Sequence, residues 1–543
     1  MESTPDRSAA AGGPKLGHVP RAVWWTTASW IALLLGYSLL VPTYRGPDEP
    51  QHVDLADHVS RELDYPAWDE RRLDPGLVRA TRLAGFGRDE LEFTSAGALP
   101  RDERPSVDEL RDPPRSTGRN QLPQHPPLYY TVVGGVDHVV DAVLPGHLFG
   151  SYDQQAWLYR LLSVVMVAPL PLVTWAVAHG LGLPEPVGVA SALVPFCIPQ
   201  LAHIGSVANN DDLLMLLFWL VTPLVVRFAR GRLAIEPVVL AGLVSGLALL
   251  TKGQALVMPL WVLGALALGF RRARADRWRI ARVVGAYLGT TLLAGGWWWF
   301  RNLVRYGELA PSIEYARFDV TQGRDTGITR FAHASAYYTN RRFWGDFGWI
   351  DVALPSRAIV AATVVAIVAL VLALRPRAFG VALATRLVML ASLVLLMAFT
   401  CYASYRLFSR SGNLPLMQGR YWFGSLAAVS VLLAMGLAAL LPSRERWLPL
   451  AVAAMAIAMQ VTAVRTLVGF YWGTPGASTT ERLSALVAWS PIPGEAVTVG
   501  AAIGTVVFAA TVGTLATMAR RPEGRLVQAT PIDRPTWKKR ASA

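Results

Sequence analysis

Twelve apolar runs separated by short polar connections restrict the fold of this chain more than any other feature. A helix needs about 20 mostly apolar residues to span a bilayer, because its backbone polar groups must be satisfied within the segment. The runs lie at 22–41, 157–178, 187–203, 213–226, 237–250, 255–270, 283–299, 358–374, 387–400, 421–441, 448–464 and 497–518. They predict an all-α integral membrane protein, in which the first run is an uncleaved anchor because no small-residue cleavage site follows it.

The composition excludes several other classes of protein. Hydrophobic residues make up 53% of the 543 positions and charged residues only 16%, whereas a soluble domain has about 25% charged residues. The formal charge is +13, but Lys and Arg lie between apolar runs rather than on one soluble face, which argues against nucleic acid as a partner. Cys197 and Cys401 have the spacing of neither a metal pair nor a disulfide framework.

The distribution of Lys and Arg predicts the orientation of the helices, because short cytoplasmic connections are enriched in both. Six segments have a net charge of +18 and leave −5 for the rest of the chain: 1–22, 227–232, 271–282, 375–386, 443–446 and 520–543. Segment 126–143 does not fit this scheme, because counting it as a span would invert every later connection. Either it is a short or re-entrant helix, or one crossing between Tyr129 and Pro184 is miscounted.

This topology predicts seven segments: a cytoplasmic tail at 1–21, a first transmembrane helix at 22–42, a first extracytoplasmic loop at 43–125, a transmembrane core at 126–300, a second extracytoplasmic loop at 301–357, C-terminal transmembrane helices at 358–518 and a basic cytoplasmic tail at 519–543. Between Thr43 and Gln124, the first loop carries 17 of the 38 acidic residues and a net charge of −5. Amphipathic patches within it predict short helices at the membrane surface.

The first loop begins with a charged motif, residues 46–52 (GPDEPQH). One interpretation is structural: Pro50 can occupy the first turn of a helix, where acidic residues are favoured by the helix dipole. The other is chemical: Asp48 and Glu49, held against the membrane, are candidates for a general base or a metal site, because partial desolvation tunes the protonation of a carboxylate. If a helix begins at Asp48, His52 lies on the same face of it.

Two more polar clusters adjoin apolar runs. The first loop ends at residues 124–130 (QHPPLYY), where His125 and Tyr129 either mark a helix start with interfacial aromatic residues or belong to a site. Residues 206–212 (SVANNDD) either cap the next helix or contribute to the same site, since the adjacent acids Asp211 and Asp212 exceed what a cap requires.

In combination, these motifs resemble the GT-C superfamily of integral-membrane glycosyltransferases, which includes the protein O-mannosyltransferases. That superfamily carries a paired-acid motif in its first extracytoplasmic loop, like Asp48 and Glu49, and a stretch like residues 125–128 at the end of the loop. The chain also resembles the bacterial membrane-protein family of domain of unknown function 2142, through residues 47–52, 126–130, 210–211, 251–252, 299–302, 306–307, 343–349 and 418–421. The resemblance implies a GT-C-like bundle of about 12–13 transmembrane helices with interfacial helices in its first loop.

The resemblance further implies an inverting transfer of a sugar from a polyprenyl-phosphate donor to an acceptor hydroxyl on the extracytoplasmic side. Asp48 is the expected general base, with Glu49 as its partner or a metal ligand. Lys252, Arg301 and Arg420, each at the outer end of an apolar run, are expected to bind the leaving phosphate. The alternative for each of these cations is snorkelling to lipid headgroups.

Other residues are expected to bind substrates or a metal ion. The predicted substrate-binding residues are His125, Tyr129, Asn210, Asp211, Trp344, Asp346, Trp349 and Tyr421, and Arg406 and Arg410 are further phosphate candidates. Because some superfamily members need a divalent cation, Asp48, His52 and Asp211 are candidate ligands for Mg, Mn or Ca. The expected partners are membrane lipid, a polyprenyl-phosphate sugar and a glycan, lipid or protein acceptor, at the bacterial cytoplasmic membrane. The oligomeric state stays open.

Two other classes of function remain as alternatives. A lipid or polysaccharide transporter typically shows inverted repeats and polar breaks near the middle of the membrane, whereas the polar motifs here cluster at one interface. That distribution favours chemistry at the membrane surface. A non-catalytic subunit of an envelope assembly is the other alternative, and it predicts that Asp48→Asn leaves function intact.

Overall fold

The computed structural model describes residues 19–68, 70–86, 97–112, 118–143, 149–311, 326–376, 378–412 and 417–520. Within these ranges the chain is mainly helical, and a short antiparallel pair joins β1 (Asp346–Phe347) to β2 (Val352–Ala353). The predicted all-α class is therefore confirmed. Residues 1–18 and 521–543, which make up most of the two predicted cytoplasmic tails, lie outside the described ranges.

Nine helical segments among the described residues are long and apolar enough to cross a membrane, which confirms a multi-pass membrane protein. They are formed by α1 (Arg21–Leu40), α5 (Tyr152–Val167) with α6 (Leu170–Gly180), α9 (Asp211–Ala229), η5 (Gly253–Leu256) with α11 (Val257–Ala273), α16 (Ser356–Ala373), α17 (Leu383–Ser411), η8 (Gly419–Ser425) with α18 (Leu426–Ala438), η9 (Glu445–Trp447) with α19 (Leu448–Tyr471), and α21 (Gly494–Arg520).

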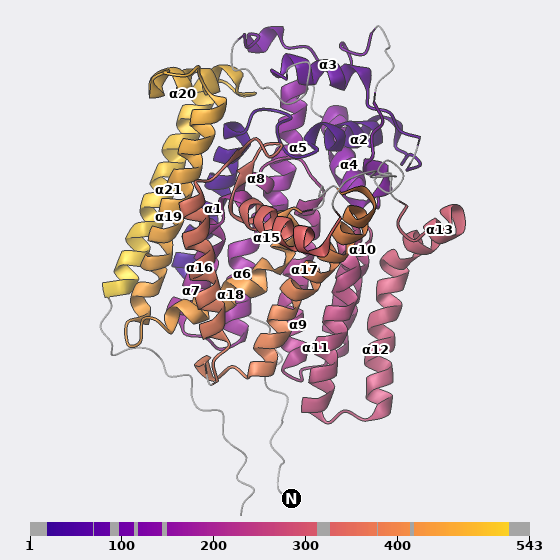
Figure 1. Cartoon of the computed structure of the whole chain (residues 1–543), viewed down its shortest axis with the longest axis vertical. Helices are drawn as coiled ribbons and strands as arrows, with labels where there is room; N and C mark the ends of the chain where they lie inside the picture. The colour runs from indigo at the N-terminus through magenta and orange to yellow at the C-terminus, as the bar shows by residue number, and fades with distance from the viewer. Residues whose placement is uncertain are drawn as a thin grey trace, which may run out of the picture.

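The remaining predicted runs also fall on helices, although these are shorter or more polar. Run 187–203 forms α7 (Glu185–Leu193), η4 (Val194–Cys197) and α8 (Pro199–Ile204), and run 237–250 forms α10 (Ile235–Leu249). Run 283–299 falls on α12 (Arg277–Thr291), a π-helical turn, η6 (Leu292–Gly296), and the start of α13 (Trp297–Tyr306). Helix α13 projects from the side of the bundle (Figure 1).

The bundle has buried central helices and lipid-facing outer ones. Helices α9 and α18 are mostly buried, whereas α21 at the edge of the bundle exposes Val499, Ile503 and Val506. Exposed apolar side chains on a long helix are expected where the surrounding solvent is lipid. Because α21 packs against α1, where Ser29 Oγ and Thr511 Oγ1 are 2.8 Å apart, the C-terminal helix completes the bundle beside the N-terminal one.

Segment 126–143 forms a short helix outside the spans. Helix α4 (Leu128–Val143) carries Asp137 and Asp141 and packs against α2 (Glu49–Glu62) in the upper part of the molecule (Figure 1). The contact is so close that a Cβ on Gly134 would lie 2.6 Å from the carbonyl oxygen of Ala56. The structure therefore favours the short-helix interpretation of this segment over a miscounted crossing.

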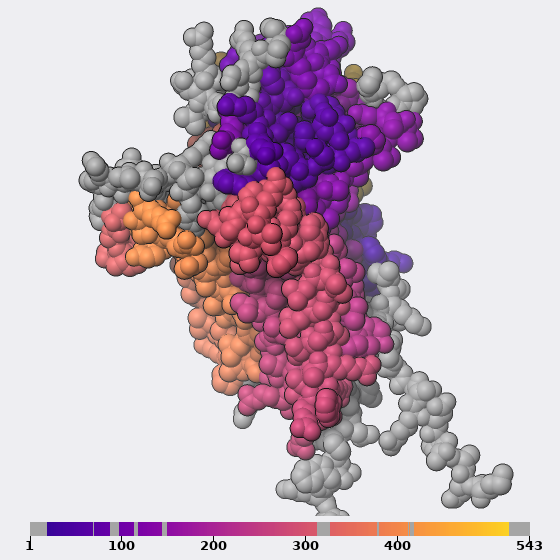
Figure 2. Space-filling model, turned by 90° about the vertical axis from the view of Figure 1, so that its right-hand side faces the viewer, coloured from indigo at the N-terminus to yellow at the C-terminus, as the bar shows by residue number. Residues whose placement is uncertain are grey.

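Several smaller elements complete the chain: α3 (Pro75–Leu83), η2 (Arg101–Glu103), η3 (Leu122–Gln124), α15 (Ile328–Trp344), η7 (Ala378–Gly380) and α20 (Thr479–Trp489). Helix α15 crosses the front of the bundle in Figure 1, and α20 lies at its upper edge. Figure 2 shows the first loop, in indigo and violet, directly above the pink α12 and α13 on one face of the molecule.

The basic connections meet at one end of the bundle. Arg272 Nη1 donates to the carbonyl of Ala229 at 2.6 Å and to Thr385 Oγ1 at 2.9 Å, and Arg386 Nη1 donates to the carbonyl of Arg375 at 2.8 Å. Figure 1 shows the α11–α12 connection at the end opposite α2 and α3. The acidic first loop and the basic connections therefore lie at opposite ends, as the positive-inside rule requires.

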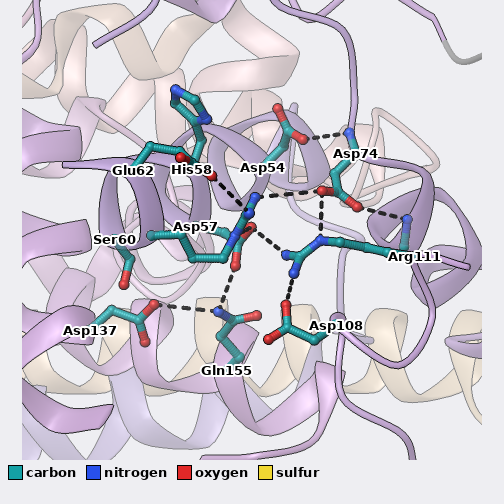
Figure 3. A network of polar contacts seen from close by, with 12 residues as sticks. Asp54, Asp57, His58, Ser60, Glu62, Asp74, Asp108, Arg111, Asp137 and Gln155 are labelled. Carbon is teal, nitrogen blue, oxygen red and sulfur yellow. Dashed lines mark hydrogen bonds and ion pairs between the residues drawn. The ribbon is translucent and has the colours of Figure 1, made fainter. Parts of the chain in front are cut away.

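A network of ion pairs around buried acids holds the first loop together (Figure 3). Asp57 accepts hydrogen bonds from Arg61 and Arg111, each at 3.0 Å, and Arg111 also donates to Asp74 at 2.8 Å. Gln155 on α5 donates to Asp57 at 3.1 Å and so ties the loop to the bundle. We call the following residues the loop network: Asp54, Asp57, Arg61, Arg71, Asp74, Arg111, Asp137 and Gln155. Asp54, Asp57 and Asp74 are thus structural rather than free.

Candidate active site

Four predicted site residues form a continuous series of ion pairs. Lys252 Nζ lies 2.6 Å from Asp211 Oδ1, Arg420 Nε lies 3.3 Å from Asp211 Oδ2, and Arg420 Nη2 lies 3.4 Å from Asp48 Oδ2. Lys252, Asp211 and Arg420 are buried, whereas the side chain of Asp48 is 43% exposed. We call these four residues the ion-pair chain. Asp48 is the solvent-accessible end of the ion-pair chain.

Each member of the ion-pair chain comes from the end of a helical element. Asp48 precedes the first residue of α2 with a left-handed φ of 57°, a conformation that Asp tolerates better than most residues. Asp211 is the first residue of α9, Lys252 precedes η5, and Arg420 is the second residue of η8. Tyr421 lies beside both cations, with its ring centre 5.2 Å from Lys252 Nζ and 5.5 Å from Arg420 Cζ.

Glu49, the second acid of the motif, is placed differently from Asp48. Its carboxylate accepts two hydrogen bonds from Arg160, each at 2.7 Å, and others from the backbone N–H groups of Gly46 at 2.9 Å and Ala208 at 3.1 Å. It is fully buried. Both of its oxygens are therefore occupied, and Glu49 fixes the start of the first loop against α5 and the segment before α9.

Arg160 is a structural partner that the sequence motifs did not include. Besides Glu49, it donates to the carbonyls of Ser38, Val41 and Pro42, each at 2.7 Å. It lies inside an apolar run, where a charged side chain needs a buried partner. An isolated arginine within an apolar run is the feature of the sequence that indicates a buried acidic partner, although the sequence alone does not show which acid that is.

Histidine and tyrosine side chains border the ion-pair chain. His52 Nδ1 is 3.0 Å from the hydroxyl of Tyr130, and Tyr129 lies edge-on to both rings. Burial, reinforced by the positive charge of Lys252, lowers the pKa of His125 to about 3, and the same causes hold the pKa of His52 well below its usual range. Both imidazole rings are therefore neutral at physiological pH.

Three neighbouring side chains have buried polar atoms without hydrogen-bond partners among the described residues. They are both amide atoms of Asn210, Nη1 of Arg420 and Nε1 of Trp422. A buried polar group without a partner costs about 1–3 kcal/mol, so such groups are rare and call for an explanation. A polar ligand beside the ion-pair chain would satisfy them.

A large apolar cavity lies next to this cluster. It has a volume of about 760 Å³ and is walled by residues of α15, α16, α17, α18 and α19. Element η8 joins the cavity to the ion-pair chain, because Trp422 and Ser425 line the cavity while Arg420 belongs to the ion-pair chain. Ile367 of α16 also lines the cavity and is 56% exposed, so the cavity reaches the lipid-facing surface.

Several predicted substrate-binding residues contact residues outside the ion-pair chain. Trp344 belongs to the wall of the apolar cavity, where its Nε1 donates to Thr363 Oγ1 at 2.9 Å. Asp346 pairs with Arg341 at 3.0 Å and with Arg342 at 3.6 Å. Trp349 packs edge-on against Phe86, with ring centres 6.2 Å apart.

Two predicted phosphate ligands outside the ion-pair chain, Arg301 and Arg406, lie near aromatic rings. Arg301 Cζ lies 4.5 Å from the ring centre of Trp298 and 6.0 Å from that of Tyr306. Arg406 Cζ lies 5.8 Å from the ring centre of Tyr402. The structure thus brings Lys252 and Arg420 together at one place, while Arg301 occupies another.

The predicted metal ligands are not arranged around a common point. Among the described residues, no group of three or more His, Cys, Asp or Glu side chains could hold a metal ion. The oxygens of Asp211 face Lys252 and Arg420, and His52 faces Tyr130. Cations therefore occupy the positions around Asp211 in the structure, and the reaction proposed below is written without a metal ion.

Comparison with known proteins supports a relationship to membrane glycosyltransferases. Residues 147–299 match the family model described as dolichyl-phosphate-mannose-protein mannosyltransferase. This segment includes Arg160, Asp211 and Lys252. No curated protein sequence matches the chain significantly.

Solved structures of other proteins are also similar to the chain at low sequence identity. ArnT from Cupriavidus metallidurans, bound to undecaprenyl phosphate, is 14% identical with a TM-score of 0.43, over 92% of this chain and 77% of that one. AglB from Archaeoglobus fulgidus, an archaeal oligosaccharyltransferase in complex with an inhibitory peptide and a dolichol-phosphate, is 13% identical with a TM-score of 0.34, over 91% of this chain and 55% of that one. The family-model match confirms the predicted enzyme class, a membrane glycosyltransferase.

Proposed function

We propose that the chain transfers a sugar, with inversion, from a polyprenyl-phosphate donor to an acceptor hydroxyl on the extracytoplasmic side of a bacterial cytoplasmic membrane. The observation that carries this proposal is the continuity of η8, which supplies Arg420 to the ion-pair chain and Trp422 to the apolar cavity. A donor with a charged head and a long apolar tail needs a charged site directly beside an apolar cavity. The matched mannosyltransferase model supports the same class of donor.

The donor phosphate is proposed to bind at the buried cations. Arg420 Nη1, Trp422 Nε1 and the amide of Asn210 have no hydrogen-bond partner within the part of the chain that the structure describes, and Arg420 and Lys252 share the carboxylate of Asp211. Charge-assisted hydrogen bonds from such donors are stronger than neutral ones and are well suited to the charge that develops on a leaving phosphate. The isoprenoid tail would occupy the apolar cavity, where burial of apolar surface favours binding.

Donor binding would also release the base. In the structure Arg420 contacts both Asp48 and Asp211. A phosphate that binds the guanidinium of Arg420 competes with Asp48 for it. Asp48 is the most exposed member of the ion-pair chain and has the longest ion-pair distance in it. Asp48 then becomes free to face the acceptor only once the donor is present, which protects the donor from attack by water before it is fully bound.

The reaction follows from these positions. Asp48 accepts the proton of the acceptor hydroxyl as that oxygen forms a bond to the anomeric carbon of the donor sugar. The bond between the anomeric carbon and the phosphate oxygen breaks, and the electron pair leaves with the polyprenyl phosphate. Arg420 and Lys252 stabilise the negative charge of this leaving group. Attack from the side opposite the phosphate inverts the anomeric centre.

Glu49 has a positioning role in this scheme. Its two oxygens are engaged by Arg160 and by backbone N–H groups, so it does not exchange protons with a substrate. It fixes the residue that precedes it, Asp48, at the rim of the buried cations. The acidic loop that carries both residues lies opposite the basic connections, which supports an extracytoplasmic site.

Transfer in proteoliposomes tests this function. The full chain is reconstituted with a radiolabelled polyprenyl-phosphate sugar and an extract of envelope acceptors, and the wild type is compared with Asp48→Asn. Loss of a general base is expected to reduce the transfer rate by about 10² to 10⁴-fold. Undiminished transfer in Asp48→Asn would reject the assigned base, and absence of transfer with every donor tried would favour a transporter.

A further inference from the structure

Residues 342–351, which include the sequence FWGDFGW at 343–349, take no part in the reaction described above. They run from the last turn of α15, which crosses the front of the bundle in Figure 1, through β1 to the turn before β2. Two of their aromatic side chains are buried, Trp344 at 6% exposure and Phe347 completely. We call residues 342–351 the bridging segment.

One end of the bridging segment contacts the residues that precede Arg420. Arg342 Nη1 donates to the carbonyl of Met417 at 2.9 Å. A Cβ on Gly419 would clash with the backbone N and Cα of Phe343, so the two backbones are in direct contact. Because Arg420 follows Gly419 directly, the place of its side chain depends on this end of the bridging segment.

The other end contacts a residue close to Asp48. Asp351 Oδ2 accepts hydrogen bonds from Arg45 Nε at 2.8 Å and from the hydroxyl of Tyr471 at 2.7 Å. The side chains of Arg45 and Asp351 are only 1% and 7% exposed. A buried pair of this kind resists separation far more than a surface pair does. Arg45 lies three residues before Asp48, so this ion pair fixes the chain just ahead of the proposed base.

The turn that ends at Asp48 needs such support. Tyr44 and Asp48 have left-handed φ angles of 64° and 57°. This conformation costs free energy in residues other than glycine, and it persists only where surrounding contacts enforce it. The hydroxyl of Tyr44 donates to the carbonyl of Tyr152 at 2.9 Å, and Asp351 holds Arg45. The position of Asp48 therefore depends on contacts from other elements.

Between its two ends the bridging segment is attached to α8. The backbone N–H of Asp346 donates to Gln200 Oε1 at 2.8 Å, and that of Gly348 donates to His203 Nε2 at 3.3 Å. Gly348 has a φ of 65°, and a Cβ at this position would clash with the carboxylate of Asp351. The second glycine of the sequence motif is thus required by the packing, and the two ends of the segment are joined through a fixed middle.

We infer that the bridging segment sets the distance between the proposed base, Asp48, and the proposed phosphate ligand, Arg420. Asp351 positions the first of these residues and Arg342 positions the second. The two side chains are 3.4 Å apart in the structure, and a shift of about 1 Å in a reacting group can cost about 10²-fold in rate. The inference rests on the proposed function for the chemistry of the site, whereas the contacts that fix the two positions do not.

Hydrogen–deuterium exchange of the full chain in detergent tests these contacts without reference to the reaction. Asp351→Asn should raise amide exchange about tenfold in peptides that cover residues 44–50 and leave residues 417–425 unchanged, because it weakens one charge-assisted contact. Arg342→Gln should have the opposite pattern. Arg341→Gln is the matched control, since it removes the neighbouring cation, which is 31% exposed and pairs with Asp346; it should leave exchange of both peptides unchanged.

Transfer kinetics separate positioning from a merely structural role. Per folded molecule, Asp351→Asn should lower kcat by about 10 to 10²-fold with little change in the KM for the donor, because it displaces the base. Arg342→Gln should raise the donor KM about tenfold, because it displaces a phosphate ligand. Asp351→Glu and Arg342→Lys keep the charges and should recover most of each loss. A structural role would change only the folded fraction.

Two further variants serve if the first ones do not fold. Tyr471→Phe removes one hydrogen bond from the carboxylate of Asp351 and should give a smaller increase in the exchange of residues 44–50. Gly419→Ala forces the two backbones apart and should raise both the exchange of residues 417–425 and the donor KM.

The outcomes distinguish this inference from the proposed function. Exchange that is unchanged in both peptides, or raised equally in both by each variant, overturns the inference. Wild-type values of kcat and KM in Asp351→Asn and Arg342→Gln would overturn it as well. If the exchange responds as expected in a chain that transfers no sugar from any donor, the bridging segment holds both positions and the proposed function alone is rejected.

Discussion

The loop network and the ion-pair chain are built from the same residue types but differ in how fully their polar groups are satisfied. In the loop network both oxygens of Asp57 and of Asp74 accept hydrogen bonds from other residues of the protein. In the ion-pair chain Arg420, and beside it Asn210, have buried polar atoms without a hydrogen-bond partner among the described residues. Both regions contain buried charged residues, such as Asp57 in one and Asp211 in the other, so burial alone does not distinguish them.

This difference separates residues that hold the fold from residues that are available to a ligand. A buried network stabilises a structure when all its members are satisfied, and a partly satisfied one is destabilising unless something else completes it. We therefore expect substitutions of the ion-paired residues of the loop network to reduce stability, and substitutions in the ion-pair chain to reduce activity. The predictions below test that division.

The largest difference in transfer rate is expected between substitutions of two arginines, Arg420 and Arg111. Arg420→Gln should reduce transfer by about 10² to 10³-fold, the usual effect of removing one group that stabilises developing charge. Arg111→Gln, the matched change in the loop network, should lower the thermal unfolding temperature and leave the rate of the folded fraction within about threefold of the wild type. Transfer rates and thermal unfolding in detergent measure both. If Arg111→Gln reduced the rate per folded molecule as strongly as Arg420→Gln, the division would not hold.

Glu49 and Asp48 provide the same contrast between adjacent residues. Glu49→Gln leaves Arg160 buried without a charged partner, so we expect the chain to lose about 3–5 kcal/mol of stability, the usual effect of breaking a buried pair. Asp48→Asn should change stability by less than about 1 kcal/mol, because Asp48 is 43% exposed and weakly paired.

Chemical unfolding in mixed micelles measures the stability of both variants. The double variant Glu49→Gln, Arg160→Met removes the uncompensated charge and should recover part of the loss. A stable but inactive Glu49→Gln variant would instead assign Glu49 to the chemistry.

The raised pKa of Asp137, a residue of the loop network, predicts a smaller, pH-dependent effect on the stability of the protein. Burial raises the pKa of Asp137 from 3.8 to about 6. Because the folded state binds the proton more tightly than the unfolded state, this group's contribution to stability is present below about pH 4 and is lost as the pH rises through about 6. Asp137→Asn should therefore be more stable than the wild type at pH 7, by at most about 3 kcal/mol, and should lack that dependence. Equal pH dependence in the two proteins would show that Asp137 does not titrate as stated.

His125 is expected to have the smallest effect on the pH profile. Since burial and Lys252 lower its pKa to about 3, its ring carries no charge between about pH 5 and 9. His125→Gln should therefore leave the shape of the pH–rate profile unchanged, even if the rate falls. A limb of that profile that moves by more than about half a pH unit would show that His125 exchanges protons during the reaction.

The sequence was sufficient to predict the helical membrane class and much of the charged cluster. Apolar runs report on helices directly, because every lipid-exposed backbone group must be satisfied within its helix. Asp48, Asp211, Lys252 and Arg420 stand out because each is charged and lies at the end of an apolar run. The structure brings these four together.

The sequence could not distinguish the partners of these charges. Asp48 and Glu49 are neighbours of the same chemical type, and only the fold shows that Arg160 engages one of them. Trp297 and Trp298 likewise differ only in the direction they face, which depends on how α13 meets the first loop. Position along the chain gives Arg301 the same rank as Lys252 and Arg420, because it does not reveal which helix ends meet.

The central claim is that Arg420 and the adjoining cavity bind a polyprenyl phosphate, and native mass spectrometry of the full chain with undecaprenyl phosphate tests it most directly. The account predicts a bound lipid on the wild type and on Arg111→Gln, with affinity at least about tenfold lower for Arg420→Gln, since a charge-assisted hydrogen bond contributes about 1.5–3 kcal/mol. Binding of equal affinity to all three proteins, or no binding to the wild type, would contradict it.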